Sequence, residues 1–203
     1  ISCSADGLAA VRAQLPDGVP VFFARDAVQA SAEVPAQRIA ISAADSPEQI
    51  ANALGIVFDG DIAILVRSDA ELPPFALARL LGALEDPTVR AAGALDNLAP
   101  SRSPLPAGST VADPASRIDA LCHAYGERRL VDSADVSPLA SAWRLHADAR
   151  HGRVVTLDHL YVATREGAAI AAAADADRRD PQPPSPLAGL RMRVAEALAT
   201  TTT

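Results

Sequence analysis

The chain of 203 residues contains no lysine, because all 18 of its basic residues are arginines. This absence excludes a Schiff-base lysine and a P-loop lysine that would hold a nucleotide phosphate. The 25 acidic residues outnumber the basic ones, and the arginines form no basic cluster. The composition therefore argues against a dedicated nucleic-acid binder, and its richness in arginine and alanine is typical of a bacterial coding sequence.

Cysteine is scarce as well, and Cys3 and Cys122 provide neither a disulfide framework nor a zinc site. No run of 18 uncharged apolar residues occurs, which predicts that the chain has no transmembrane segment. No signal peptide is visible, so we expect a cytoplasmic protein. The chain begins at Ile1 rather than methionine, which favours a piece of a longer protein.

The first hundred residues alternate between helical and strand patterns. Apolar spacing predicts helices over 5–15, 47–58 and 73–85, and strands over 19–23, 38–42, 61–66 and 88–95. Ser46, Pro47 and Gln49 form a capping box at the start of the second helix. The alternation predicts an α/β fold with a mostly parallel sheet and helices on both faces.

The second half of the sequence is less regular. A long loop is expected over 98–115, followed by helices over 118–125 and, from Ser137-Pro138, over 137–149. Strands over 154–157 and 160–163 and an alanine-rich helix over 168–174 complete a domain of residues 1–179. Residues 180–203 then form a proline-rich linker, a helix over 187–199 and a tail.

The motifs of common nucleotide and hydrolase sites are absent, including Gly-x-Gly-x-x-Gly, the Walker loop, Gly-x-Ser-x-Gly and His-Glu-x-x-His. An acidic cluster does occur, because Asp69 and Glu71 follow the apolar strand 61–66. Ligands of open α/β sheets bind beyond the carboxyl ends of the strands. Carboxylates there can hold a divalent cation that neutralises a nucleotide diphosphate. Alternatively, both acids stabilise the N-terminus of the helix that follows.

Residues 61–95, DIAILVRSDAELPPFALARLLGALEDPTVRAAGAL, resemble the core of the family 2 glycosyltransferases. That family shows an apolar strand, Asp-x-Asp, a proline-started helix and Asp-Pro-x-Val-x-x-x-Gly, which Asp86, Pro87, Val89 and Gly93 match here. The resemblance covers residues 1–95 and, more faintly, 150–175. It implies a Rossmann-like GT-A fold and transfer of a sugar from a nucleotide-sugar donor to an acceptor hydroxyl in bacterial polysaccharide or glycoconjugate synthesis.

The resemblance also implies roles for single residues. Asp69, with Glu71, would hold Mg or Mn beneath the donor diphosphate, and Asp26 would contact the base or ribose. Asp158 or His159 would lie near the carbohydrate or lipid-linked acceptor, where a carboxylate deprotonates the attacking hydroxyl. A structural role for His159 on its apolar strand is the simpler alternative.

The chain departs from the family at the first acid of Asp-x-Asp, which is Arg67 here. Arg67 can pair with Asp69 or contact a phosphate directly, and either reduces the need for metal. The Glu-Asp pair of the family's general base is missing as well. Two alternatives to a transferase therefore stay open: a degenerate GT-A scaffold or binding domain without catalysis, and a GT-A-like nucleotidyltransferase.

Overall fold

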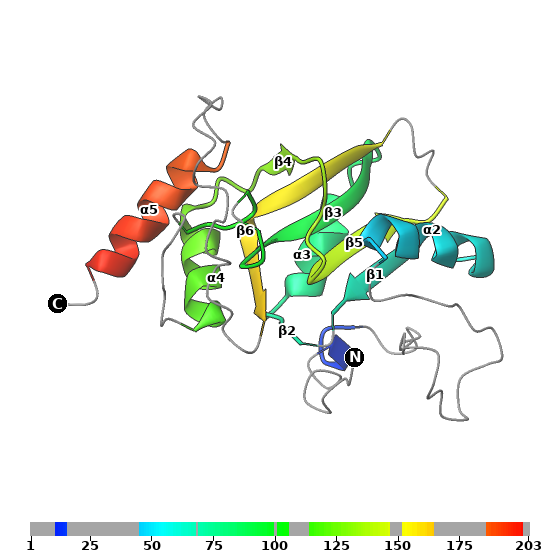
Figure 1. Cartoon of the computed structure of the whole chain (residues 1–203), viewed down its shortest axis with the longest axis horizontal. Helices are drawn as coiled ribbons and strands as arrows, with labels where there is room; N and C mark the ends of the chain where they lie inside the picture. The colour runs from blue at the N-terminus through cyan, green and yellow to red at the C-terminus, as the bar shows by residue number, and fades with distance from the viewer. Residues whose placement is uncertain are drawn as a thin grey trace.

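The computed structural model describes residues 11–15, 45–67, 69–99, 101–105, 114–146, 152–164 and 186–200. The helices are α2 (Pro47–Val57), α3 (Ala76–Ala83), α4 (Ala115–Tyr125) and α5 (Ala188–Ala199). The strands are β1 (Ile62–Val66), β2 (Ala70–Glu71), β3 (Val89–Asp96), β4 (Leu130–Asp132), β5 (Ala140–Arg144) and β6 (Arg153–Thr164) (Figure 1). The predicted strands 19–23 and 38–42, the helix 168–174, most of the helix 5–15 and nearly all of the linker lie outside the described residues.

The strands form one mixed sheet in the order β1-β5-β3-β6-β2, with β4 also paired to β6. β5 runs antiparallel to both of its neighbours, β1 and β3, whereas β3 and β6 are parallel. β1, β3 and β6 therefore point the same way, and β5 is reversed between them. The α/β class is confirmed, but the expected mostly parallel sheet is not what the described strands form.

The reversed strand replaces the helix predicted over 137–149, and that prediction is wrong. The Ser137 hydroxyl accepts a hydrogen bond from the backbone N–H of Leu139 (3.1 Å), which closes a local turn in place of a helix cap. The small residues Ala140 and Ala142 then face the core beneath α3, and Trp143 faces the opposite side of the sheet. Pairing on both edges of β5 outweighs the helical propensity of its alanines.

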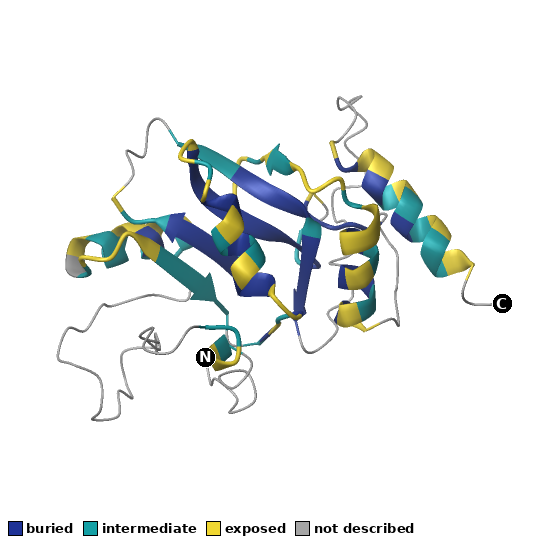
Figure 2. Ribbon diagram, turned by 180° about the vertical axis from the view of Figure 1, so that it is seen from behind, coloured by how far each residue is buried: buried dark blue, intermediate teal, exposed yellow. Residues whose placement is uncertain are grey.

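Helices cover both faces of the sheet, as the sequence predicts. α3 packs on one face through Leu80 and Leu84, and α2 packs on the other through Ala51. A further apolar cluster joins α4, α5 and the end of β6, where Leu190 and Val194 of α5 are buried (Figure 2). α5 confirms the helix predicted over 187–199, and it shares a core with α4. No described helix is long and apolar enough to cross a membrane.

The start of α2 is confirmed in detail, whereas α3 and β1 differ from their predictions. The side chains of Ser46 and Gln49 each bond to the other's backbone N–H, which completes the capping box of α2. α3 begins later than its prolines indicate, with Phe75 as its N-cap. β1 is half-buried along most of its length, although its continuous apolar run predicts burial on both faces.

The Asp86–Gly93 pattern has a structural explanation in this chain. The Asp86 carboxylate accepts hydrogen bonds from the backbone N–H and the hydroxyl of Thr88, which fixes the turn before β3. Gly93 lies beneath the segment that crosses the sheet from β4 to β5, and a Cβ there would come within 2.9 Å of Ser137 N and Val136 Cβ. Asp86 and Gly93 therefore help to build the sheet in this chain.

Candidate functional site

The candidate site lies at the edge of the sheet where β1, β3 and β6 end. A hydrogen bond from Ala70 N to the Arg67 carbonyl (3.0 Å) closes a turn after β1, and Arg67 N donates to Leu139 O (2.9 Å). The turn leads into β2, whose Ala70 pairs with Thr164 at the end of β6. The strand pairing thus places Arg67 and Asp69 at the same edge as Asp96, the last residue of β3.

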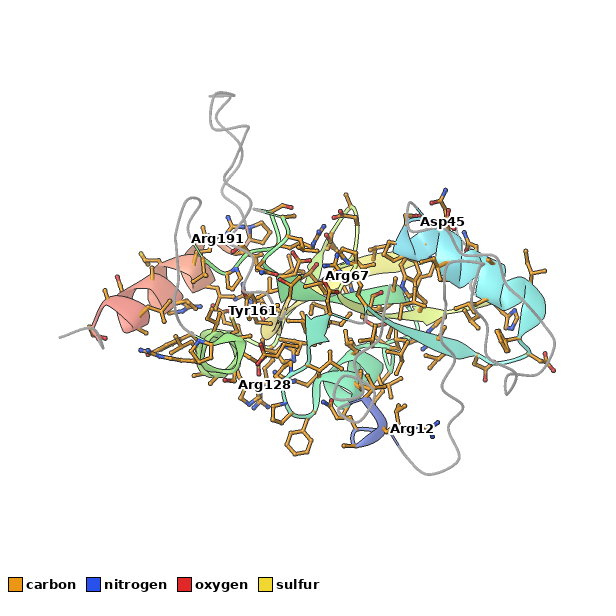
Figure 3. All side chains as sticks on the ribbon, turned by 60° about the horizontal axis from the view of Figure 1, so that its bottom comes forward. Arg12, Asp45, Arg67, Arg128, Tyr161 and Arg191 are labelled. Carbon is orange, nitrogen blue, oxygen red and sulfur yellow. The ribbon has the colours of Figure 1, made fainter. Side chains whose placement is uncertain are left out.

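Arg67, labelled in Figure 3, forms a two-point ion pair with Asp69 at this edge. Arg67 Nε and Nη2 donate to Asp69 Oδ1 and Oδ2 at 2.5 and 2.6 Å. The hydrogen bonds to Asp69 raise the pKa of Arg67, and the negative charges of Asp69 and Asp96 act in the same direction against burial. The guanidinium is permanently charged, and its fork matches the two oxygens of the carboxylate.

This geometry does not fit a divalent cation at Asp69. Both carboxylate oxygens already face a guanidinium, and a metal ion on them would lie beside a fixed positive charge. Glu71 is exposed on β2 and follows the buried Ala70. In the part of the chain that the structure describes, no group of three or more His, Cys, Asp or Glu side chains could hold a metal. The Mg or Mn expected from the resemblance therefore lacks a suitable donor set among these residues.

A second ion pair lies deeper at the same edge. The Asp96 side chain is completely buried, and its carboxylate accepts hydrogen bonds from Leu98 N, Ala99 N and, at 2.7 Å, Arg102 Nε. Arg102 also donates to the exposed Asp135 at 2.6 Å. Burial alone would lower the pKa of Arg102, but the two carboxylates outweigh it and raise that pKa. Asp96 is thereby bound by Arg102 and by the backbone of its own loop.

Asp96 and Arg102 are not among the site residues predicted from the sequence. The same rule that selects Asp69, an acid directly after a strand, also selects Asp96, because the strand predicted over 88–95 ends just before it. No pattern in the sequence selects Arg102, because it reaches Asp96 only through the way in which a loop folds. Arg191 of α5 holds that loop by donating to the carbonyls of Ser101 and Ser103 (Figure 3).

Asp158 and His159 lie in an irregularity of β6, away from the Arg67 turn. An advance of four positions along β6, from Leu157 to Tyr161, is matched by an advance of one position on β3, from Ala94 to Leu95. The Asp158 carboxylate accepts hydrogen bonds from the backbone N–H groups of Glu127 and Arg129, at 2.9 and 3.0 Å. Asp158 therefore fastens the connection from α4 to β4.

His159 lies close to Asp158, with Nδ1 3.2 Å from Asp158 Oδ1. Burial lowers the pKa of His159, although the hydrogen bond and charge of Asp158 oppose the shift. Arg79 donates to the His159 carbonyl at 2.7 Å and also binds Asp119 of α4. These contacts favour the structural role of His159 over a role near the acceptor.

The space around Asp158 is small. Asp158, Arg129 and Arg193 line a cavity of about 60 Å³ beside the first turn of α5, which has room for a few water molecules. Five residues of β6 lie between Asp158 and Thr164 at the edge of the sheet. The structure thus brings Arg67 and Asp69 together and places Asp158 and His159 elsewhere, and Asp26 lies outside the described residues.

The fold and the site together define an α/β protein with a mixed sheet and a charged carboxyl edge. A comparison with protein-family models, curated proteins and solved structures finds no match to this chain.

Proposed function

We propose that this chain is a glycosyltransferase-like domain that binds a nucleotide-sugar donor at the carboxyl edge of its sheet and transfers the sugar to an acceptor hydroxyl. The observation that carries the proposal is the turn after β1, which presents Arg67 and Asp69 at the edge where β3 and β6 also end. The resemblance of residues 61–95 to family 2 glycosyltransferases adds the donor class.

Under this proposal the donor diphosphate lies against the Arg67 turn, and Asp26 contacts the base or ribose. The acceptor is a carbohydrate or a lipid-linked carbohydrate of bacterial polysaccharide or glycoconjugate synthesis, and the setting is cytoplasmic. Asp158 and His159 stay the predicted acceptor-side residues, although they lie away from the Arg67 turn and Asp158 already accepts two backbone hydrogen bonds.

Calorimetric titration of UDP, GDP and dTDP, each with and without Mn, tests the donor site. We expect one of the three to bind with a micromolar Kd, and the matching nucleoside to bind at least tenfold more weakly because it lacks the phosphates. If none of them binds under either condition, the donor site does not exist and the proposal fails.

A binding domain without catalysis is the second candidate. It is favoured by the engagement of Asp158, since a carboxylate that accepts two backbone N–H bonds is poorly placed to take a proton from a hydroxyl. Once the nucleotide is known, incubation with the corresponding UDP-, GDP- or dTDP-sugar distinguishes the two candidates. Release of nucleoside diphosphate, with or without an added oligosaccharide, supports the transferase, and binding without turnover supports the binding domain.

A further inference from the structure

The two ion pairs at the carboxyl edge differ in how easily they can exchange partners. Arg67 and Asp69 keep 32% and 41% of their side-chain surface exposed, whereas Arg102 and Asp96 keep 9% and 0%. Asp96 is also held by two backbone N–H groups of its own loop. A ligand arriving from solvent therefore meets the Arg67 pair and cannot reach the Asp96 pair.

A phosphate can replace the carboxylate on Arg67. The guanidinium presents Nε and Nη2 in parallel to two oxygens, and phosphate oxygens match that fork as well as carboxylate oxygens do. Two phosphates carry more negative charge than one carboxylate, and the pair is solvent-accessible.

We propose that Arg67 binds the diphosphate of the donor directly, and that Asp69 is its resting counter-ion, which leaves the guanidinium when the phosphates arrive. This inference rests on the proposed function for the identity of the donor. The positive charge that faces the diphosphate is then that of the Arg67 side chain rather than that of a metal ion. Asp69 competes with the ligand for Arg67 instead of helping to hold the ligand. Asp96 stays with Arg102 throughout.

The competition predicts that Asp69→Asn binds the diphosphate more tightly than the wild type does. Removing the carboxylate charge frees the Arg67 fork and also removes a negative charge beside the phosphates. We expect about threefold tighter binding of the diphosphate, since partly exposed ion pairs contribute up to about 1 kcal/mol, or roughly fivefold. Arg67→Gln removes a charge-assisted contact and is expected to weaken binding by roughly 10- to 100-fold. Arg67→Lys, which keeps a point charge, should fall between wild type and Arg67→Gln.

The experiment is a calorimetric titration of UDP, GDP, dTDP and inorganic pyrophosphate in EDTA, repeated with Mn in place of EDTA. The control variant is Asp132→Asn, which changes the net charge equally. Asp132 pairs with Arg153 where β6 begins, at the opposite edge of the sheet. Urea midpoints of all the variants show that each one folds.

Tighter binding by Asp69→Asn in EDTA, with no change in Asp132→Asn and a loss in Arg67→Gln, supports the inference. Weaker binding by Asp69→Asn, or binding that needs Mn, overturns it and leaves a nucleotide site in place. Equal affinity for UDP and uridine also overturns it. Binding of pyrophosphate without any nucleotide would support the Arg67 exchange while refuting the proposed function, and no binding at all refutes both.

Discussion

Replacement of Asp158 by alanine tests whether this residue holds the fold or performs chemistry. The substitution removes the acceptor of two backbone hydrogen bonds, from Glu127 N at 2.9 Å and Arg129 N at 3.0 Å, and the Asp158 side chain is only 8% exposed. A hydrogen bond to a charged group contributes about 1.5–3 kcal/mol. The connection from α4 to β4 is exposed, so water replaces part of what is lost.

We expect Asp158→Ala to lower the free energy of unfolding by about 2–3 kcal/mol. For a domain of this size that corresponds to a decrease in Tm of roughly 4–12 °C. Asp158→Asn keeps one oxygen acceptor and should lose about half as much. Urea denaturation followed by circular dichroism gives both values, and a thermal melt provides the check.

Asp132→Ala is the matched control, because Asp132 is 73% exposed and pairs with Arg153 on the surface. It should change the unfolding free energy by no more than about 0.5 kcal/mol. A similarly small effect of Asp158→Ala would refute the structural explanation. If such a stable variant also lost the transfer of sugar, the catalytic prediction for Asp158 would regain its strength.

Three further outcomes are expected. Gly93→Ala should lower the free energy of unfolding in urea by about 1–3 kcal/mol, because its Cβ would lie 2.9 Å from the segment that crosses the sheet. Gly82→Ala, on an exposed turn of α3 with open space around it, should instead raise that free energy by about 0.5–1 kcal/mol. Equal effects of the two substitutions would contradict the packing at Gly93. Arg191→Gln should accelerate amide hydrogen exchange in residues 101–105, because Arg191 donates to two carbonyls of that loop. Arg193→Gln, on the same helix, should leave this exchange unchanged. The same protection pattern in both variants would show that Arg191 does not hold the loop. Burial lowers the pKa of His159, so the unfolded chain takes up a proton at a higher pH than the folded chain does, and stability should fall as the pH drops from about 6.5 toward the folded pKa. His159→Gln should make the urea midpoint less dependent on pH in this range. An unchanged pH dependence would show that His159 does not cause it.

Local signals predicted much of the described fold from the sequence. The capping box of α2, the apolar run of β1 and the amphipathic pattern of α5 each depend on residues within one element. The structure confirms these elements to within a few residues. Such signals succeed because the residue pattern that defines each element lies within that element.

The error at β5 shows what local signals cannot contain. Ser137-Pro138 and the alanines after it have the composition of a helix start, but β5 lies in the centre of the sheet, between β1 and β3. Its register depends on partners more than 40 residues away, such as Ala91 opposite Trp143. The alternation of helices and strands in the first hundred residues predicts a mostly parallel sheet, and the helix predicted over 137–149 leaves out the antiparallel strand that lies between β1 and β3.

The site was predictable in part for the same reason. The position of Asp69 after β1 follows from the strand pattern alone, and pairing between Arg67 and Asp69 follows from their spacing of two residues. The bond between Arg102 and Asp96 depends on how a loop returns to its strand. The role of Asp158 depends on which backbone N–H groups α4 brings to it.

Because the two arginine–aspartate pairs differ in burial, they differ in the free energy that is needed to open them. Breaking a buried pair such as Arg102–Asp96 costs about 3–5 kcal/mol, because an uncompensated charge stays behind in the core. Opening a partly exposed pair such as Arg67–Asp69 costs about 1 kcal/mol or less. A ligand that gains a few kcal/mol from phosphate contacts can therefore displace Asp69 while the Arg102–Asp96 pair stays closed. Under the proposed exchange the edge keeps its shape when the ligand binds, and Arg67 is the group whose partner changes.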